Sequence, residues 1–118
     1  LEGDTAPYIQ YAAVRAAKIL KKSKKKPGRI VELSDEAYEL VKKIGEFPEV
    51  VEQAAEKYAQ NLVANYTYDL AQLFNNFYDK HRVIGHELEE QRLAVVKAFH
   101  DTITTALYLL GIEIPEEM

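Results

Sequence analysis

The sequence predicts an all-α fold, a bundle of about five helices. Apolar residues recur at steps of three and four over most of the chain, and glycine and proline fall mainly at the ends of these periodic stretches. No stretch alternates apolar and polar residues over the length of a strand, apart from a short strand-like segment at residues 29–33. Because 118 residues suit one domain, we expect a single domain over residues 1–118.

The first two helices are predicted from their ends as well as from their periodicity. Pro7 suits a first helical turn, and the first helix should run from about residue 8 to residue 20 and stop before Pro27-Gly28. Its apolar positions are Ile9, Ala12, Ala13, Ala16, Ile19 and Leu20. Ser34 is expected to cap the second helix, because its hydroxyl can accept a bond from an early backbone N–H, and Gly45 is expected to end it.

Three further helices are expected in the rest of the chain. The third opens at Phe47-Pro48, with inward residues Val50, Val51, Ala54 and Ala55. The fourth runs from about residue 56 or 58 to residue 78, with an apolar stripe of Leu62, Tyr66, Leu70, Leu73 and Phe77. After a connection at residues 80–86, the fifth covers about residues 88–110, with Gly111 as its C-cap. Its stripe is Leu93, Val96, Phe99, Ile103, Leu107 and Leu110.

The charge is distributed unevenly. The net charge is −4, yet residues 11–29 contain eight basic residues and no acidic one, while the remainder has seven basic and nineteen acidic residues. Like charges crowded in this way repel one another, so the basic segment indicates either an anionic partner or a solvated loop. The sequence alone is compatible with both interpretations.

Several function classes are disfavoured by composition. The chain has no cysteine, which excludes a disulfide framework and fits a reducing compartment, so we expect a cytoplasmic protein. No apolar run reaches the roughly 18 residues of a membrane span, and the first residues do not resemble a signal peptide. His81 and His86 are five residues apart and His100 is isolated, so no metal site is expected. With no glycine-rich phosphate loop and no nucleophile–base motif, we expect no catalytic residue and no cofactor in this chain.

Three segments carry motifs of one known family. Residues 2–12 read Glu-Gly-Asp-Thr-Ala-Pro-Tyr-Ile-Gln-Tyr-Ala and are followed by Arg15, residues 68–78 end in Phe-Asn-Asn-Phe-Tyr, and residues 92–98 begin Arg-Leu-Ala-Val. The last ten residues read Leu-Leu-Gly-Ile-Glu-Ile-Pro-Glu-Glu-Met. In this order the motifs resemble the C-terminal part of arginyl-tRNA synthetases. Ala13 departs from the pattern, which often has histidine there, and residues 20–58 match too poorly to carry anything over.

The resemblance implies a helical anticodon-binding domain of class I aminoacyl-tRNA synthetases, of the type named for an Asp-Ala-Leu-Arg motif. It implies that ATP-dependent joining of arginine to tRNA takes place on a separate catalytic domain, whose nucleotide-binding signatures are absent here. We therefore expect a fragment that begins where that domain ends, whose partners are arginine tRNA and the enzyme's own catalytic domain. ATP would be a cofactor of the catalytic domain alone, and no membrane partner is expected.

Aromatic side chains are the first candidates for RNA contacts, because proteins recognise single-stranded loops by stacking bases on aromatic rings. Tyr8 and Tyr11 are three residues apart, hence neighbours on one helix surface, and the resemblance places them nearest the anticodon loop. Interhelical packing of both rings is the alternative. Tyr78 and Arg82 could flank the same loop, although the position of Arg82 varies in the family. Met118 matches the family's terminal methionine, which lies near the anticodon-binding face.

Polar and basic side chains complete the predicted site. Gln10, Asn75 and Asn76 are candidates for reading the middle cytosine that arginine anticodons share, with capping or interhelical bonding as the alternative. Arg15 and Lys18 lie one and two turns beyond Tyr11, where they could meet phosphates, and the run at residues 21–26 could extend that track along the stem.

The sequence is also compatible with other functions. One is the anticodon domain of another class I synthetase, such as the cysteinyl enzyme, or the similar module of the glycyl-tRNA synthetase larger subunit. Another is a helical protein-interaction module whose tyrosine and leucine stripes dock a partner helix. Salt-dependent binding of an anticodon stem-loop would separate RNA binding from protein binding. A small hydrolase is disfavoured by the missing nucleophile–base arrangement.

Overall fold

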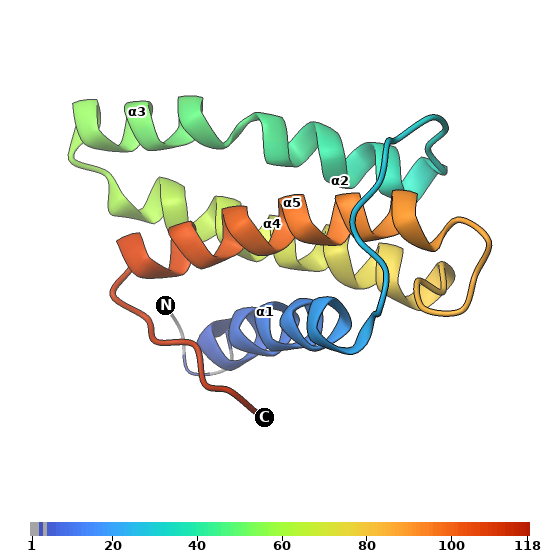
Figure 1. Cartoon of the computed structure of the whole chain (residues 1–118). Helices are drawn as coiled ribbons and strands as arrows, with labels where there is room; N and C mark the ends of the chain where they lie inside the picture. The colour runs from blue at the N-terminus through green and yellow to red at the C-terminus, as the bar shows by residue number, and fades with distance from the viewer. Residues whose placement is uncertain (1–2, 4) are drawn as a thin grey trace.

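The computed structural model contains five α-helices (Figure 1). They are α1 (Thr5–Lys22), α2 (Asp35–Gly45), α3 (Phe47–Lys57), α4 (Gln60–Lys80) and α5 (Glu89–Leu109). The structure describes Gly3 and residues 5–118, and this part of the chain contains no strand, so the predicted all-α fold is confirmed. Leu1, Glu2 and Asp4, which belong to the N-terminal motif, lie outside the described residues. No helix in the described part is long and apolar enough to cross a membrane.

The helices form three layers (Figure 1). α4 and α5 contact each other in the middle, α1 packs against both of them on one side, and α2 packs against both on the other. α3 continues the layer of α2 and packs mainly against α4. Because α4 and α5 are covered on two sides, they supply most of the core.

The core is built around stacked aromatic rings. Phe74 of α4 lies against Phe99 of α5 with ring centroids 4.1 Å apart and planes 7° apart. The periodicity of α4 predicted half-buried Leu62 and Leu73 as core residues but omitted Phe74 and Val63, which are buried. A helix between two layers has a wider buried face than the single stripe that periodicity indicates, which explains this difference.

α3 differs most from the prediction. None of its residues is fully buried, and Ala55, predicted to point inward, is exposed. The apolar side of α3 faces only part of α4, so Val50 and Val51 are half-buried. The predicted start of α4 is also wrong: Tyr58 adopts a left-handed conformation with φ of 52° and ends α3, so α4 begins only at Gln60.

The helix ends agree with their predicted signals. The Ser34 hydroxyl accepts a hydrogen bond from the backbone N–H of Ala37 at 3.2 Å and caps α2. After α5, Gly111 adopts a φ of 73°, and Ile112 N–H donates to the Leu107 carbonyl at 2.9 Å, which closes a Schellman motif. This turn directs the C-terminal tail, residues 112–118, back along α1 (Figure 1).

The segment between α1 and α2 crosses the start of α5. Gly28 N–H donates to the Glu90 carbonyl at 2.7 Å, and a Cβ at Gly28 would lie only 2.9 Å from the Glu90 Cβ, so the close approach requires glycine. The Gln91 side chain accepts bonds from the N–H groups of Val31 and Glu32 and donates to the Glu32 carbonyl. The strand-like residues 29–33 are therefore paired with one glutamine side chain instead of a second strand.

Candidate nucleic-acid interface

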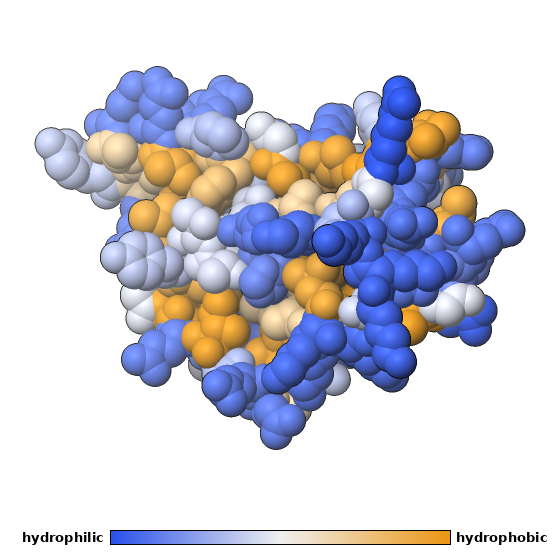
Figure 2. Space-filling model, in the orientation of Figure 1, coloured by the Kyte–Doolittle hydropathy of each residue, from blue (hydrophilic) through white to orange (hydrophobic). Residues whose placement is uncertain are grey.

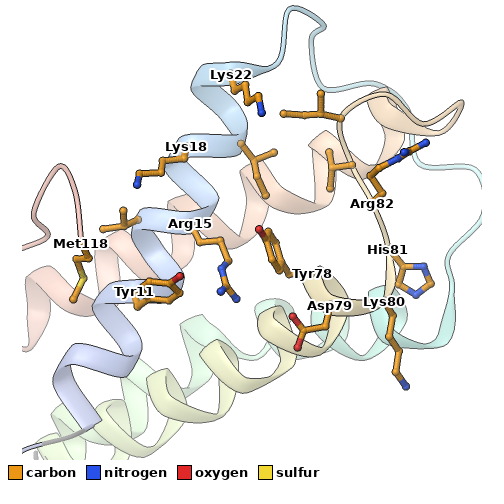
Figure 3. Close-up of a pocket in the computed structure, with 14 residues that line it drawn as sticks. Tyr11, Arg15, Lys18, Lys22, Tyr78, Asp79, Lys80, His81, Arg82 and Met118 are labelled. Carbon is orange, nitrogen blue, oxygen red and sulfur yellow. The ribbon is translucent and has the colours of Figure 1, made fainter.

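A hollow of about 810 Å³ opens between α1, the end of α4 and the last residue of the chain (Figure 3). Six of the nine predicted site residues line it: Tyr11, Arg15, Lys18, Tyr78, Arg82 and Met118. We call this hollow the Tyr11–Tyr78 pocket. It combines residues from both ends and the middle of the sequence, and the fold brings them together.

The centre of the pocket is the guanidinium group of Arg15. Its carbon lies 4.6 Å from the centroid of the Tyr11 ring and 4.1 Å from that of the Tyr78 ring, within the range of cation–π contacts. Arg15 Nη1 donates a hydrogen bond to Asn75 Oδ1 at 3.0 Å. In Figure 3 the guanidinium lies between the two rings. Both tyrosines remain partly accessible, with 45% of Tyr11 and 39% of Tyr78 exposed. A flat cation is thus held between two accessible aromatic groups.

Helical spacing explains how these side chains meet. Tyr11, Arg15, Lys18 and Lys22 follow steps of four, three and four, which place them along one face of α1. Tyr78 lies at the end of α4, and its ring packs against that of buried Phe74, with centroids 6.1 Å apart. Because α1 packs on α4, the aromatic and basic face of α1 meets Tyr78 across the pocket.

The pocket carries an excess of positive charge. Arg15, Lys18, Lys22, Lys80 and Arg82 line it, and Asp79 is the acidic residue among its lining. Within the described part of the chain only Lys80 of these cations forms an ion pair, with Glu36 at 3.4 Å. Figure 2 shows hydrophilic residues where α1 ends and where the segment that follows it crosses α5. Uncompensated positive charge of this kind attracts anions such as phosphate groups.

His81 connects the edge of the pocket to α2. Its Nε2 lies 2.8 Å from Glu36 Oε1, and its ring packs against Phe77 with centroids 5.7 Å apart. The hydrogen bond with His81 is the main cause that lowers the pKa of Glu36. The contact holds the end of α4 against the start of α2. Among the described residues no group of three histidine or carboxylate side chains is placed to hold a metal ion.

Three predicted site residues do not line the pocket: Tyr8, Gln10 and Asn75, of which Asn75 is linked to it through its hydrogen bond with Arg15. The Tyr8 ring contacts that of Tyr68 with centroids 5.3 Å apart and packs, half-buried, against the core, which is the packing alternative considered for it. Gln10 Nε2 donates to the Glu113 carbonyl at 2.7 Å and so holds the C-terminal tail against α1. Asn76, the third amide considered, is exposed and does not line the pocket.

Several pocket residues were not singled out from the sequence. Lys22 follows Lys18 on the same face of α1, so helical spacing alone could have separated it from the other lysines of the run. The apolar floor includes Ile19, Val83 and Ile84. Val83 and Ile84 belong to the connection between α4 and α5, which has no helical periodicity, and no sequence signal placed them at the site.

A second hollow, of about 970 Å³, provides a contrast near the start of α4. It is lined by polar amides such as Gln60, Asn61 and Asn65 together with Asp69, and no lysine or arginine among the described residues lines it. A polyanion has no counter-charge in that hollow. The basic and aromatic groups are concentrated instead in the Tyr11–Tyr78 pocket.

The chain is a layered helical bundle whose pocket combines aromatic and basic side chains, the groups to which single-stranded nucleic acids bind. Comparison with known families agrees: the family described as DALR anticodon binding domain matches residues 9–118, and the chain belongs to this family. The predicted family is thereby confirmed.

Similar proteins have consistent names. The arginine–tRNA ligase of Pyrococcus abyssi is 42% identical over 126 residues, covering 99% of this chain and 20% of that protein. The corresponding ligase of Limosilactobacillus fermentum is 39% identical, covering 99% of this chain and 22% of that protein. The Thermus thermophilus arginyl-tRNA synthetase structure superposes with a TM-score of 0.88 at 35% identity, covering 99% of this chain and 22% of that chain. The chain thus spans about a fifth of the length of the curated relatives it matches.

Proposed function

We propose that this chain binds the anticodon stem and loop of arginine tRNA as the anticodon-binding part of an arginine–tRNA ligase. The observation that carries the proposal is the Arg15 guanidinium held between Tyr11 and Tyr78 in an open, positively charged pocket. Family membership and the ligase relatives support it. Joining of arginine to tRNA with ATP would then take place on another part of the parent protein.

The pocket offers the groups that recognition of an unpaired cytosine requires. The exposed faces of Tyr11 and Tyr78 can stack on a base, and each such stack contributes about 1–3 kcal/mol. Cytosine presents a ring nitrogen and a carbonyl as acceptors, and the Arg15 N–H groups that are not bonded to Asn75 can donate to them. The exocyclic amine of cytosine needs an acceptor, which a tyrosine hydroxyl or a backbone carbonyl can supply. Arginine anticodons share such a cytosine at their middle position.

The C-terminal tail forms one side of this base-binding site. Ile112 and Ile114 pack partly against the core, and the hydrogen bond from Gln10 to the Glu113 carbonyl fixes the tail beside α1. Met118 then lies next to Tyr11 (Figure 3), half exposed at the mouth of the pocket. In this proposal Gln10 acts by placing Met118, and the Met118 side chain contacts the base.

Basic side chains around the base-binding site would contact the RNA backbone. Lys18 and Lys22 extend along α1 from the stacked tyrosine, and the lysines at residues 24–26 continue beyond the end of the helix. Contacts of this kind set affinity and its salt dependence, whereas contacts to base edges set sequence preference. Sequence preference is therefore assigned to Arg15 and to the two tyrosine rings that hold its guanidinium, Tyr11 and Tyr78, and overall affinity is assigned to the lysines.

The test is a titration of RNA hairpins that carry an arginine anticodon, with the middle cytosine replaced by each other base. Fluorescence anisotropy of labelled hairpins would give Kd for the wild-type chain and for Tyr11→Ala. The wild-type chain should bind the cytosine hairpin at least about tenfold more tightly, as expected for hydrogen bonds from a charged group. Tyr11→Ala should lose most of this preference, because the Tyr11 ring holds the Arg15 guanidinium that donates to the cytosine.

Tyr108→Ala is the matched control, because Tyr108 is a more exposed tyrosine on α5 that does not line the pocket. Its hairpin affinities should equal those of the wild-type chain. Equal losses for cytosine and non-cytosine hairpins in Tyr11→Ala would refute the role assigned to the ring.

A further inference from the structure

Glu89, the first residue of α5, is buried although it carries a carboxylate and does not line the pocket. Its Oε2 accepts a hydrogen bond from the Ser23 hydroxyl at 2.5 Å, and its Oε1 accepts one from the Gly85 backbone N–H at 2.8 Å. Ser23 directly follows Lys22 at the end of α1, and Gly85 belongs to the segment that carries Arg82. One side chain therefore bonds two segments that are far apart in the sequence and that both line the Tyr11–Tyr78 pocket.

One further hydrogen bond joins the Arg82 segment to the first turn of α5, and two more lie within the two segments. Arg92 Nη1 donates to the Arg82 carbonyl at 2.6 Å, and Arg82 Nη2 donates to the Gly85 carbonyl at 3.5 Å. On the other side, the Lys25 backbone N–H donates to the Ser23 hydroxyl oxygen at 3.2 Å. The bond from Ser23 is the main cause that lowers the pKa of Glu89, so the carboxylate is charged at neutral pH. The lysine-bearing end of α1 and the Arg82 segment thus share one anchor.

We infer that Glu89 is a positioning residue for RNA binding, which keeps the cations of the α1 end and of the Arg82 segment at a fixed separation. The inference rests on the proposed function. Both segments lie at the end of the pocket away from Tyr11, so Glu89 governs contacts to the RNA backbone and not to the base. Without the anchor, the two segments must be ordered when RNA binds, and fewer cations meet phosphates at once.

Three substitutions separate this role from a general effect on folding. Glu89→Ala removes both hydrogen bonds, so both segments lose the anchor that they share. Glu89→Gln retains the bridge, because the amide oxygen can accept from the Gly85 N–H and the amide nitrogen can donate to the Ser23 hydroxyl. Ser23→Ala frees only the end of α1. Glu87→Ala is the control, since it removes the same charge from an exposed residue of the connection before α5.

The experiment measures Kd for the arginine-anticodon hairpin at several salt concentrations, with folding of each variant verified by circular dichroism. Lost phosphate contacts reduce the slope of log Kd against log salt concentration. Glu89→Ala should weaken binding about fivefold and reduce that slope by about one, with its preference for cytosine unchanged. Ser23→Ala should show a smaller reduction, and both Glu89→Gln and Glu87→Ala should keep the wild-type slope.

The outcomes distinguish this inference from the proposed function. A wild-type chain that binds hairpins without dependence on salt or on the middle base overturns the proposed function, and the inference with it. A wild-type chain that binds as proposed, with wild-type slopes in folded Glu89→Ala and Ser23→Ala, overturns the inference alone, because Glu89 then only stabilises the fold. If Glu89→Ala does not fold, the slope of Ser23→Ala decides in the same way.

Discussion

The two outer layers of the bundle, α1 on one side and α2 with α3 on the other, cover the same pair of helices but differ in charge and in packing. Residues 11–29 contain eight basic residues and no acid, whereas residues 35–57 contain seven acidic and three basic ones. α1 buries five residues completely, and α3 buries none. α1 therefore packs tightly while it presents a cationic face, and α3 covers the core loosely with a face that repels polyanions.

The largest expected difference between the layers is in stability. Ile9 of α1 is fully buried, so Ile9→Ala should lower the free energy of unfolding by about 2–5 kcal/mol. Val50 of α3 is half-buried, and Val50→Ala should cost about 1 kcal/mol. Urea denaturation followed by circular dichroism measures both values. Equal losses would show that α3 is packed as tightly as α1.

A smaller effect is expected at the cap of α2. Ser34→Ala removes the hydrogen bond to the Ala37 N–H and should lower the free energy of unfolding by about 1 kcal/mol. Because Ser34 does not line the Tyr11–Tyr78 pocket, hairpin affinity should be unchanged in the folded variant. The same urea titration and an anisotropy titration check the two parts. Weaker RNA binding by the folded variant would contradict the separation of the layers.

The smallest effect concerns single lysines. Lys22→Ala should weaken all hairpins about equally and reduce the slope of log Kd against log salt concentration by about one. Lys57→Ala, at the end of α3, removes the same charge outside the pocket and should leave the slope unchanged. If the two variants had similar slopes of log Kd against log salt concentration, RNA binding would depend only on the net charge of the chain and not on the position of the lysine.

Much of the fold could be predicted because helical periodicity and end signals act locally. The Ser34 hydroxyl caps the start of α2, Gly45 is its last residue, and Gly111 turns the chain after α5, so these local signals placed the helix ends correctly. Periodicity indicates which face of a helix is apolar but not how much of that face a neighbour covers. For this reason the prediction placed exposed Ala55 in the core and omitted buried Phe74.

The candidate site could be predicted only in part for a similar reason. Tyr8 and Tyr11 are neighbours on α1, yet Tyr8 packs on Tyr68 of α4 while Tyr11 lies in the pocket. Which ring stays accessible depends on the position of α4, and spacing along α1 does not contain that information. The stacking of Arg15 between two rings likewise requires Tyr78 from another helix. Glu89 was not singled out from the sequence, because its burial results from contacts with two distant segments.

In the proposed function, an unpaired base enters the Tyr11–Tyr78 pocket beside Met118. Met118 is the single methionine of the chain, so carbon-13 labelling of methionine methyl groups gives one signal, located at the pocket. An NMR titration with the arginine-anticodon hairpin should shift or broaden that signal, and a hairpin with another middle base should affect it much less. A Met118 signal unchanged by saturating cytosine hairpin would show that no base enters the pocket beside Met118.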